Sequence, residues 1–214
     1  MRLAELSERS GVSTATIKYY LRAGLLAAGR QVNTTTAEYD EEHLRRLRLV
    51  RAMIQVGGLP VAKVREVMGH VDDESLGRTM RMGAALWALP HVPEPDEDDE
   101  YVRAAHREVG ELLDKLGWGN AQALVTISPA HRSLVVAVAA FRRLGYDWTS
   151  ERMLPYAELM HRAAVLDLDF VETQPSEAEK AEVAVIGAVL AEPMLQALRR
   201  LAQEEESARR YGFE

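Results

Sequence analysis

Cysteine is absent from the 214 residues of the sequence, and this absence excludes several kinds of chemistry. Without a thiol, the chain can form neither a disulfide nor a thiolate metal site, and it has no cysteine-based redox switch. The histidines at positions 91, 106, 131 and 161 have no second histidine three or four residues away, the spacing that places two ring nitrogens on one helical face. We therefore expect neither a bound metal nor a cofactor.

Catalytic motifs are missing as well. The sequence contains no glycine-rich phosphate loop and no serine nucleophile elbow, so we expect a protein that is not an enzyme. It has no run of eighteen consecutive apolar residues, and its first residues are polar at helical spacing rather than a charged head followed by an apolar stretch. These absences predict a cytoplasmic protein that does not enter membranes.

Charge is distributed unevenly along the chain. The formal net charge is −7, but residues 1–70 carry 11 Lys and Arg against 7 Asp and Glu, which leaves 15 against 26 for residues 71–214. A basic segment of net +4 is therefore joined to an acidic segment of net −11. Hydrophobic residues make up 47% and charged residues 28%, as in ordinary globular proteins. The basic head favours a nucleic-acid partner.

The start of the chain predicts a helix-turn-helix. An amphipathic first helix ends at Gly11, where a tight turn needs a positive φ angle. Ser13 is a good N-cap for a second short helix over residues 14–22, which Gly24 closes. The second helix would expose hydroxyls and cations, the groups that reach phosphates and base edges in a major groove.

A wing and two more helices are expected next. Residues 25–39 lack helical periodicity and suit a small two-strand wing with Arg30 and Gln31 near its tip. A helix then begins behind the cap Asp40, and a further short helix is expected over residues 60–69. The fold class is therefore mainly α, with an N-terminal winged helix-turn-helix.

The remainder of the chain predicts a connecting helix, a linker and an all-helical domain. In the helix expected over residues 72–89, apolar or small residues recur with spacings of four, three and four, which suits either packing within the chain or a contact between subunits: Leu76, Met80, Gly83 and Trp87. Three prolines and an acidic run mark a linker. Further helices are expected over 101–116, 129–144, 151–171 and 177–210, the last kinked at Pro193. The division is a winged helix-turn-helix over 1–70, a connecting or dimerisation helix over 71–89, a linker over 90–100 and an effector or dimerisation domain over 101–214.

The literal residues of the head resemble one family. The run from Gly11 to Leu26, with Gly-Val-Ser before Thr-Ile-Lys-Tyr-Tyr and then Gly-Leu-Leu, is similar to the recognition segment of MerR-family regulators. Residues 39–44 and 58–68 match the second helix pair of that family. Lys18 stands where the family usually has arginine, which keeps the attraction to phosphate but loses the bidentate fork. Leu21 replaces the usual glutamate, and the wing lacks the familiar Gly-Tyr-Arg segment.

The resemblance implies a homodimer that places two recognition helices in successive major grooves of a pseudo-palindromic operator. Such regulators bend and untwist promoter DNA and so realign it for RNA polymerase. The residues expected to contact double-stranded DNA are Ser13, Thr14, Thr16, Lys18, Tyr19, Arg22, Arg30 and Tyr39. Of the adjacent tyrosines, at least one is expected in the core and both could be, and Tyr19 is favoured at the DNA because it lies one step beyond Lys18.

Two further patterns have competing interpretations. The arginines at 45, 46, 48 and 51 resemble a phosphate-binding row, but a solvated helix face is the favoured interpretation. In the acidic body, carboxylates near aromatic residues suggest a site for a small-molecule effector, a lipophilic cation: Asp167, Asp169, Phe170, Trp148 and Tyr156. The alternative is that these aromatics form a core and the carboxylates are solvated. The body would then serve only dimerisation or protein contact in an architectural DNA-binding protein without an effector.

Overall fold

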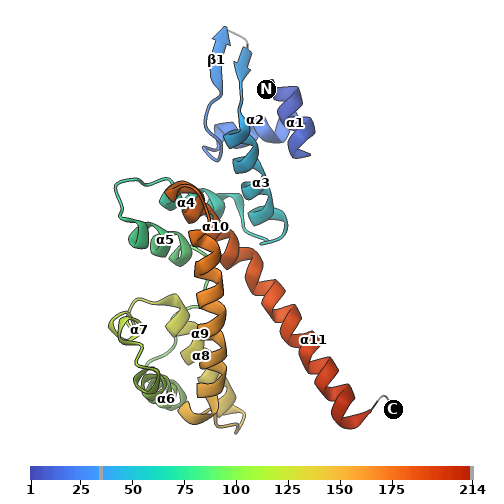
Figure 1. The fold of residues 1–214 in the computed structure, drawn as a ribbon. Coiled ribbons are helices and arrows are strands. Elements are labelled where there is room, and N and C mark those ends of the chain that lie inside the picture. The colour runs from blue at the N-terminus through green and yellow to red at the C-terminus, as the bar shows by residue number, and fades with distance from the viewer. Residues whose placement is uncertain (34–35, 213–214) are drawn as a thin grey trace. The chain divides into compact units, whose positions relative to one another are not determined.

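The computed structural model describes residues 1–33 and 36–212, and within them the chain is mainly α-helical with one two-stranded sheet. This confirms the expected fold class. The chain divides into two compact units. Figure 1 colours the chain by residue number, so the residues of each unit can be found from the bar. We call them unit 1, which comprises Met1–Ala88 with Val171–Glu214, and unit 2, which comprises Leu89–Phe170.

Unit 1 begins with the helix-turn-helix. Helix α1 spans Leu3–Ser10 and ends at Gly11, whose φ of 65° is the positive value that the sequence predicted. Helix α2 spans Thr14–Arg22, and the Oγ of its N-cap Ser13 accepts a hydrogen bond from the Thr16 backbone N–H at 3.1 Å. Ile17 and Tyr20 are buried beneath it. Local capping signals therefore gave both helices correctly.

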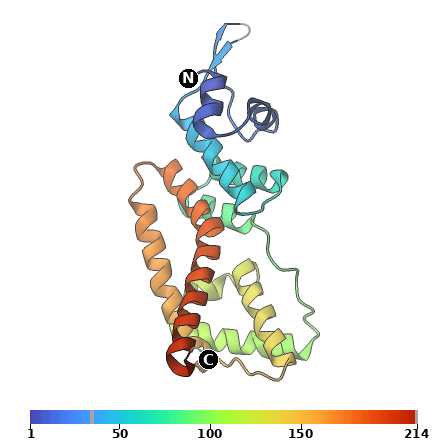
Figure 2. The same cartoon turned by 90° about the vertical axis from the view of Figure 1, so that its right-hand side faces the viewer.

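The wing is an antiparallel hairpin of β1 (Arg30–Asn33) and β2 (Thr36–Glu38). It projects from the head as a narrow arm (Figure 2). Because Arg30 pairs with Glu38 in the register, Arg30 starts the first strand at the base of the hairpin. The expectation that Arg30 and Gln31 lie near the tip was wrong, since the pair farthest from this base is Asn33 with Thr36.

Helix α3 spans Glu41–Gln55 behind an Asp40 capping box, and its inner face buries residues at helical spacing: Leu44, Leu47, Val50 and Met53. Helix α4 (Val61–Val71) continues through Gly69, which the sequence had suggested as its end. Helix α5 (Arg78–Trp87) is shorter than the expected 72–89. The reason is a local turn, because Asp73 accepts hydrogen bonds from the backbone N–H and the hydroxyl of Ser75.

The C-terminal helices belong to unit 1, whereas the sequence predicted one domain over 101–214. Helix α10 (Glu177–Ile186) contacts α3, α4 and α5, and its Ala181 and Val185 are fully buried. A π-helical turn, η1 (Gly187–Ala191), then precedes α11 (Glu192–Tyr211). This interruption lies directly before Pro193, where a kink was expected. Long-range packing of this kind leaves no local signal in the sequence.

Unit 2 is a continuous stretch of helices behind the linker. It contains α6 (Glu100–Leu116), a short α7 (Gly119–Ala123) that the sequence did not predict, α8 (Pro129–Arg143) and most of α9 (Ser150–Glu172). Ser128 caps α8, as expected, by accepting a hydrogen bond from the His131 N–H at 3.3 Å. The core consists of small and branched apolar residues from α6, α8 and α9: Val102, Ala105, Val109, Leu112, Val135, Val138, Ala139 and Met153.

One helical stretch, Glu179–Tyr211, is long and apolar enough by length and composition to cross a membrane. Only 22% of its apolar window is buried within the protein. A single stretch of this kind is weak support for a membrane span, because helices of soluble proteins pass the same test.

Candidate nucleic-acid interface

The outward face of α2 carries most of the residues that the sequence predicted at DNA. Ser13, Thr14, Lys18 and Arg22 are exposed, and Thr16 is half-buried. The Thr16 hydroxyl lies 2.8 Å from the Ser13 hydroxyl, so these two side chains also hold the start of the helix. Lys18 and Arg22 are one helical turn apart and present two positive charges on one stripe.

The adjacent tyrosines have opposite environments. Tyr19 is 46% exposed, whereas Tyr20 is 8% exposed and packs inside the head. Burial raises the pKa of the Tyr20 hydroxyl. The two rings lie 5.9 Å apart between centroids. Tyr20 is thus the expected core aromatic, and Tyr19 has the exposure that contact with DNA requires.

Tyr39 differs in environment from the other residues that the sequence predicted at DNA. It is buried, and its ring packs edge-on against His43 with the centroids 5.2 Å apart. Its backbone N–H donates to the Met1 carbonyl at 2.8 Å. A Cβ atom at Gly29 would lie 2.9 Å from the Tyr39 ring, so glycine is needed for this close approach. Tyr39 therefore anchors the base of the wing, and its contact with DNA stays a prediction.

Arg30 remains exposed at the base of the wing. It forms an ion pair with Glu38, and Arg2 lies 4.0 Å from the same carboxylate. Two arginines around one carboxylate leave a net positive charge at the base of the wing. An exposed surface pair of this type is easily exchanged for a phosphate partner because it contributes little free energy.

The arginines of the row on α3 have different environments. Arg45 and Arg48 are exposed, as a solvated face requires, although Arg45 also contacts Glu179 at 2.6 Å. Arg46 and Arg51 are half-buried: Arg46 donates to Asp72 at 3.0 Å, and Arg51 donates to the carbonyls of Ser10 and Gly11 at 3.1 and 2.8 Å. The favoured interpretation was wrong for these two, because their partners are distant in sequence and helical phase gives no sign of them.

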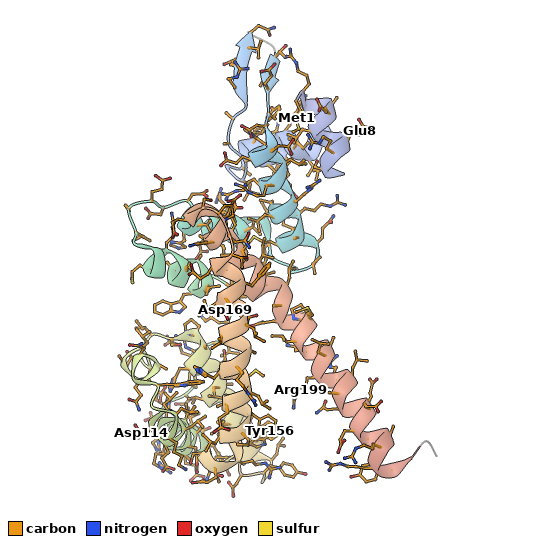
Figure 3. All side chains as sticks on the ribbon, in the orientation of Figure 1. Met1, Glu8, Asp114, Tyr156, Asp169 and Arg199 are labelled. Carbon is orange, nitrogen blue, oxygen red and sulfur yellow. The ribbon has the colours of Figure 1, made fainter. Side chains whose placement is uncertain are left out.

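The predicted effector residues do not form one site. Trp148 stacks between Phe141 and Tyr156, with centroids 5.1 and 5.5 Å away, and the Arg152 guanidinium already lies over its ring. Asp169 lies near the other end of α9 from Tyr156 (Figure 3). Thirteen residues of helix separate these two by about 20 Å.

The remaining members of that set, Asp167 and Phe170, lie near Asp169 and are exposed. They lie near the C-terminal end of α9, whereas Trp148 precedes the start of that helix. Among the described residues, no group of three or more His, Asp or Glu side chains could hold a metal ion.

The second helix has a buried side and an exposed side that carries cations, and a two-strand wing follows it. This arrangement is typical of winged helix-turn-helix regulatory proteins. The profile of the MerR helix-turn-helix regulatory protein family matches residues 1–70. Residues 1–70 therefore form a helix-turn-helix domain of the MerR type. This confirms the resemblance seen in the sequence.

Two similar proteins extend the comparison. Nodulation protein NolA from Bradyrhizobium elkanii is 36% identical over 56 residues, and the match spans 26% of this chain and 26% of NolA. The crystal structure of the "putative transcriptional regulator SCO5550" from Streptomyces coelicolor A3(2) is 66% identical and matches with a TM-score of 0.87. That match covers 100% of this chain and 99% of the other, so the likeness extends through the helical body as well as the head.

Proposed function

We propose that the protein is a sequence-specific transcriptional regulator that binds double-stranded DNA in the cytoplasm through α2. The observation that carries this proposal is the division of α2 into a buried side, Ile17 and Tyr20, and an exposed side with Lys18, Tyr19 and Arg22. A buried side fixes the helix on the head, and the exposed side is then free to enter a major groove. The description of SCO5550 agrees with this proposal.

The regulator acts as a homodimer, because one short recognition helix reads only half of a two-fold operator. Two exposed apolar surfaces of unit 1 support self-association. On α11, none of whose residues is buried, Met194, Leu198 and Leu201 are exposed with spacings of four and three. On α5, Met80 and Trp87 are exposed on one face while Ala85 packs inward.

The family resemblance supports a mechanism in which the dimer distorts its promoter. Bending and untwisting DNA costs free energy, which contacts with phosphates offset, and the distorted promoter is realigned for RNA polymerase. The protein performs no catalysis in this mechanism. A small-molecule effector would act by changing how well the dimer holds the distorted DNA.

Selection of DNA fragments from a random pool by the full-length protein tests this function. We expect enriched sites made of two inverted half-sites about ten base pairs apart, one helical turn of DNA. Enrichment without a shared sequence would overturn the regulator in favour of an architectural DNA-binding protein, and absence of binding would overturn both.

The role of α2 is tested by Lys18→Ala at several salt concentrations. The logarithm of affinity should fall less steeply with salt, by about one counterion for each subunit, because the lysine meets a phosphate. Lys63→Ala is the matched control, since Lys63 lies on α4 and contacts Glu66 at 2.7 Å. An unchanged slope for Lys18→Ala, or equal changes in both variants, would contradict the assignment.

A further inference from the structure

Unit 1 contains a cavity of about 520 Å³ beside the helix-turn-helix. Its walls come from the segment after α2, from α3, from the end of α4, from α5 and from α10. A volume of this size lies within the range of sites for small organic ligands. The cavity is distinct from the outward face of α2, because neither Lys18 nor Tyr19 lines it.

Arg81 on α5 is the anomaly in this cavity. The residue is 8% exposed, and its Nε–H is buried without a hydrogen-bond partner among the described residues. No described carboxylate oxygen lies within salt-bridge distance of its guanidinium, whereas Arg45 and Arg46 are paired. The pKa of the Asp73 carboxyl is lowered mainly by the hydrogen bond from the Ser75 side chain. The charge of Arg81 is the smallest of the causes that lower it. Burying a charge without a partner costs free energy, so an anion that paired with Arg81 would stabilise the folded protein.

His43 on α3 supplies a second unpaired atom in the wall of the same cavity. Its Nδ1 accepts a hydrogen bond from the Asp40 backbone N–H at 3.3 Å and lies 2.6 Å from the Asp40 carboxylate, while its buried Nε2 has no partner within the described part of the chain. An imidazole that is fixed through Nδ1 presents its other nitrogen in a defined direction. Two residues that each have an unpaired buried nitrogen, from two different helices, therefore line one cavity.

The other polar groups of the cavity restrict what can bind. Arg46 is occupied by Asp72 and by the Leu25 carbonyl, and Glu182 is bound by Arg45 at 3.1 Å. Burial raises the pKa of Glu182. The exposed carboxylates of Glu42 and Glu74 add negative charge to the wall and so disfavour a multiply charged anion such as phosphate.

The remaining wall is apolar and includes Leu25, Leu26 and Val71. We propose that this cavity binds a small organic monocarboxylate, whose carboxylate pairs with Arg81 beside His43 and whose apolar part packs on these three side chains. A single negative charge satisfies the arginine without strong repulsion from the acidic wall. The apolar portion contributes binding free energy in proportion to the area that it buries.

Occupation of the cavity has a structural consequence. The ligand contacts α3 and the segment after α2 on one side and α5 and α10 on the other, so it fixes the DNA-binding helices against the C-terminal part of unit 1. The effect of the ligand on DNA affinity rests on the proposed function. The binding of the ligand does not, and the two are measured separately.

Thermal unfolding of the full-length protein tests the binding site. The probes are benzoate, octanoate and indole-3-acetate, with their neutral amides and inorganic phosphate as controls. We expect at least one of these carboxylates to raise Tm by about 2 to 4 °C at about five times its dissociation constant, and its amide and phosphate to raise it far less. The absence of a shift with all three carboxylates, or an equal shift with the amides, would overturn the proposal.

Arg81→Met separates a ligand-binding arginine from a structural one. Because the substitution removes an unpaired buried charge and keeps an apolar side chain of similar length, we expect the ligand-free variant to melt at or above the wild-type Tm and to lose the carboxylate shift. Arg48→Met, at an exposed position on α3, is the control and should keep the shift.

Three results with this variant would overturn the proposal. They are a retained carboxylate shift, a lower Tm without ligand, and a weakened dimer in sedimentation, which would assign the missing counter-ion to a second copy of the chain. With selected DNA, the active carboxylate should change wild-type affinity several-fold and leave Arg81→Met unaffected. If the protein binds no DNA, the proposed function fails while the thermal shifts still decide the cavity.

Discussion

Unit 1 and unit 2 are both helical, but they are assembled from the sequence in different ways. Unit 2 is one continuous stretch, and its core comes from apolar residues that recur at helical spacing on α6 and α8. Unit 1 joins two stretches that are separated by the whole of unit 2. Its α10 is held on α3 by ion pairs as well as by apolar contact, through Arg45 with Glu179 and Glu182. Local periodicity therefore determines one unit, and contacts between distant segments complete the other.

The largest expected effect is that of truncating the chain after Phe170, which removes α10, η1 and α11. Val171 and Val185 are buried in unit 1, and full burial of such a side chain stabilises by about 1.5 to 3 kcal/mol, so the loss for unit 1 should exceed about 3 kcal/mol. Hydrogen exchange measured by mass spectrometry should show fast exchange throughout residues 1–88 and unchanged protection in unit 2.

A second truncation, after Ala191, is the matched control. It removes only α11, which buries no residue, and should leave the protection of residues 1–88 intact. If both truncated chains protect residues 1–88 equally, the C-terminal segment is not part of the stability of unit 1, and the contrast between the units disappears.

Within unit 2, Leu112→Ala should lower the free energy of unfolding by about 2 to 5 kcal/mol, because it removes a buried side chain and leaves a cavity. Leu144→Ala makes the same chemical change at an exposed position and should cost less than about 0.5 kcal/mol. Urea unfolding in a Trp87→Phe background reports unit 2 alone, since Trp118 and Trp148 then remain. Similar losses in both variants would mean that the core of unit 2 lies elsewhere.

The same contrast explains how much the sequence predicted. The caps at Ser13, Asp40 and Ser128 are local, and the helices behind them start where expected. The split between Tyr19 and Tyr20 follows from helical phase, so exposure on α2 was also predictable. The partners of the α3 arginines depend on chain segments up to 137 positions away, as for Arg45 and Glu182, and no local pattern contains that information.

Packing at shorter range was not predictable from the sequence either. The ring of Tyr39 packs against His43 and lies close to Gly29, which no motif indicated. Asp169 and Tyr156 were grouped because they belong to one predicted domain, although the length of α9 keeps them apart. The unpaired Arg81 was not singled out, because an arginine in a helix carries no mark of its burial.

The ion pairs of unit 1 can be tested by Glu182→Ala. Its removal leaves the partly buried Arg46 with one carboxylate fewer and frees Arg45 from a 3.1 Å contact, and we expect a loss of about 1 to 3 kcal/mol from unit 1. Glu8→Ala, at an exposed position on α1, is the control and should change stability by less than about 0.5 kcal/mol. Hydrogen exchange of the α10 amides is the readout, and equal protection in the two variants would show that apolar contact alone holds α10.

The smallest expected effect concerns the pH dependence of unit 2. Burial lowers the pKa of His131, and the neighbouring His106, whose ring lies 5.5 Å away, lowers it further. Below the ordinary value of 6.5, the unfolded chain therefore binds more protons at this residue than the folded chain does, so stability falls as the pH falls through 6.5. The carboxylate of Glu151, with a pKa of about 2, loses its contribution only below its ordinary value of 4.5.

The range from pH 7.5 to pH 5.5 thus isolates the histidine. Urea midpoints of the Trp87→Phe protein should decrease across this range, and the decrease should be smaller in His131→Gln, which has no ring to protonate. His91→Gln, at an exposed site where the ring Nδ1 lies 2.9 Å from the Leu89 carbonyl oxygen, should retain the parental decrease. A His131→Gln variant with the full parental pH dependence would show that this half-buried ring does not connect the stability of unit 2 to pH.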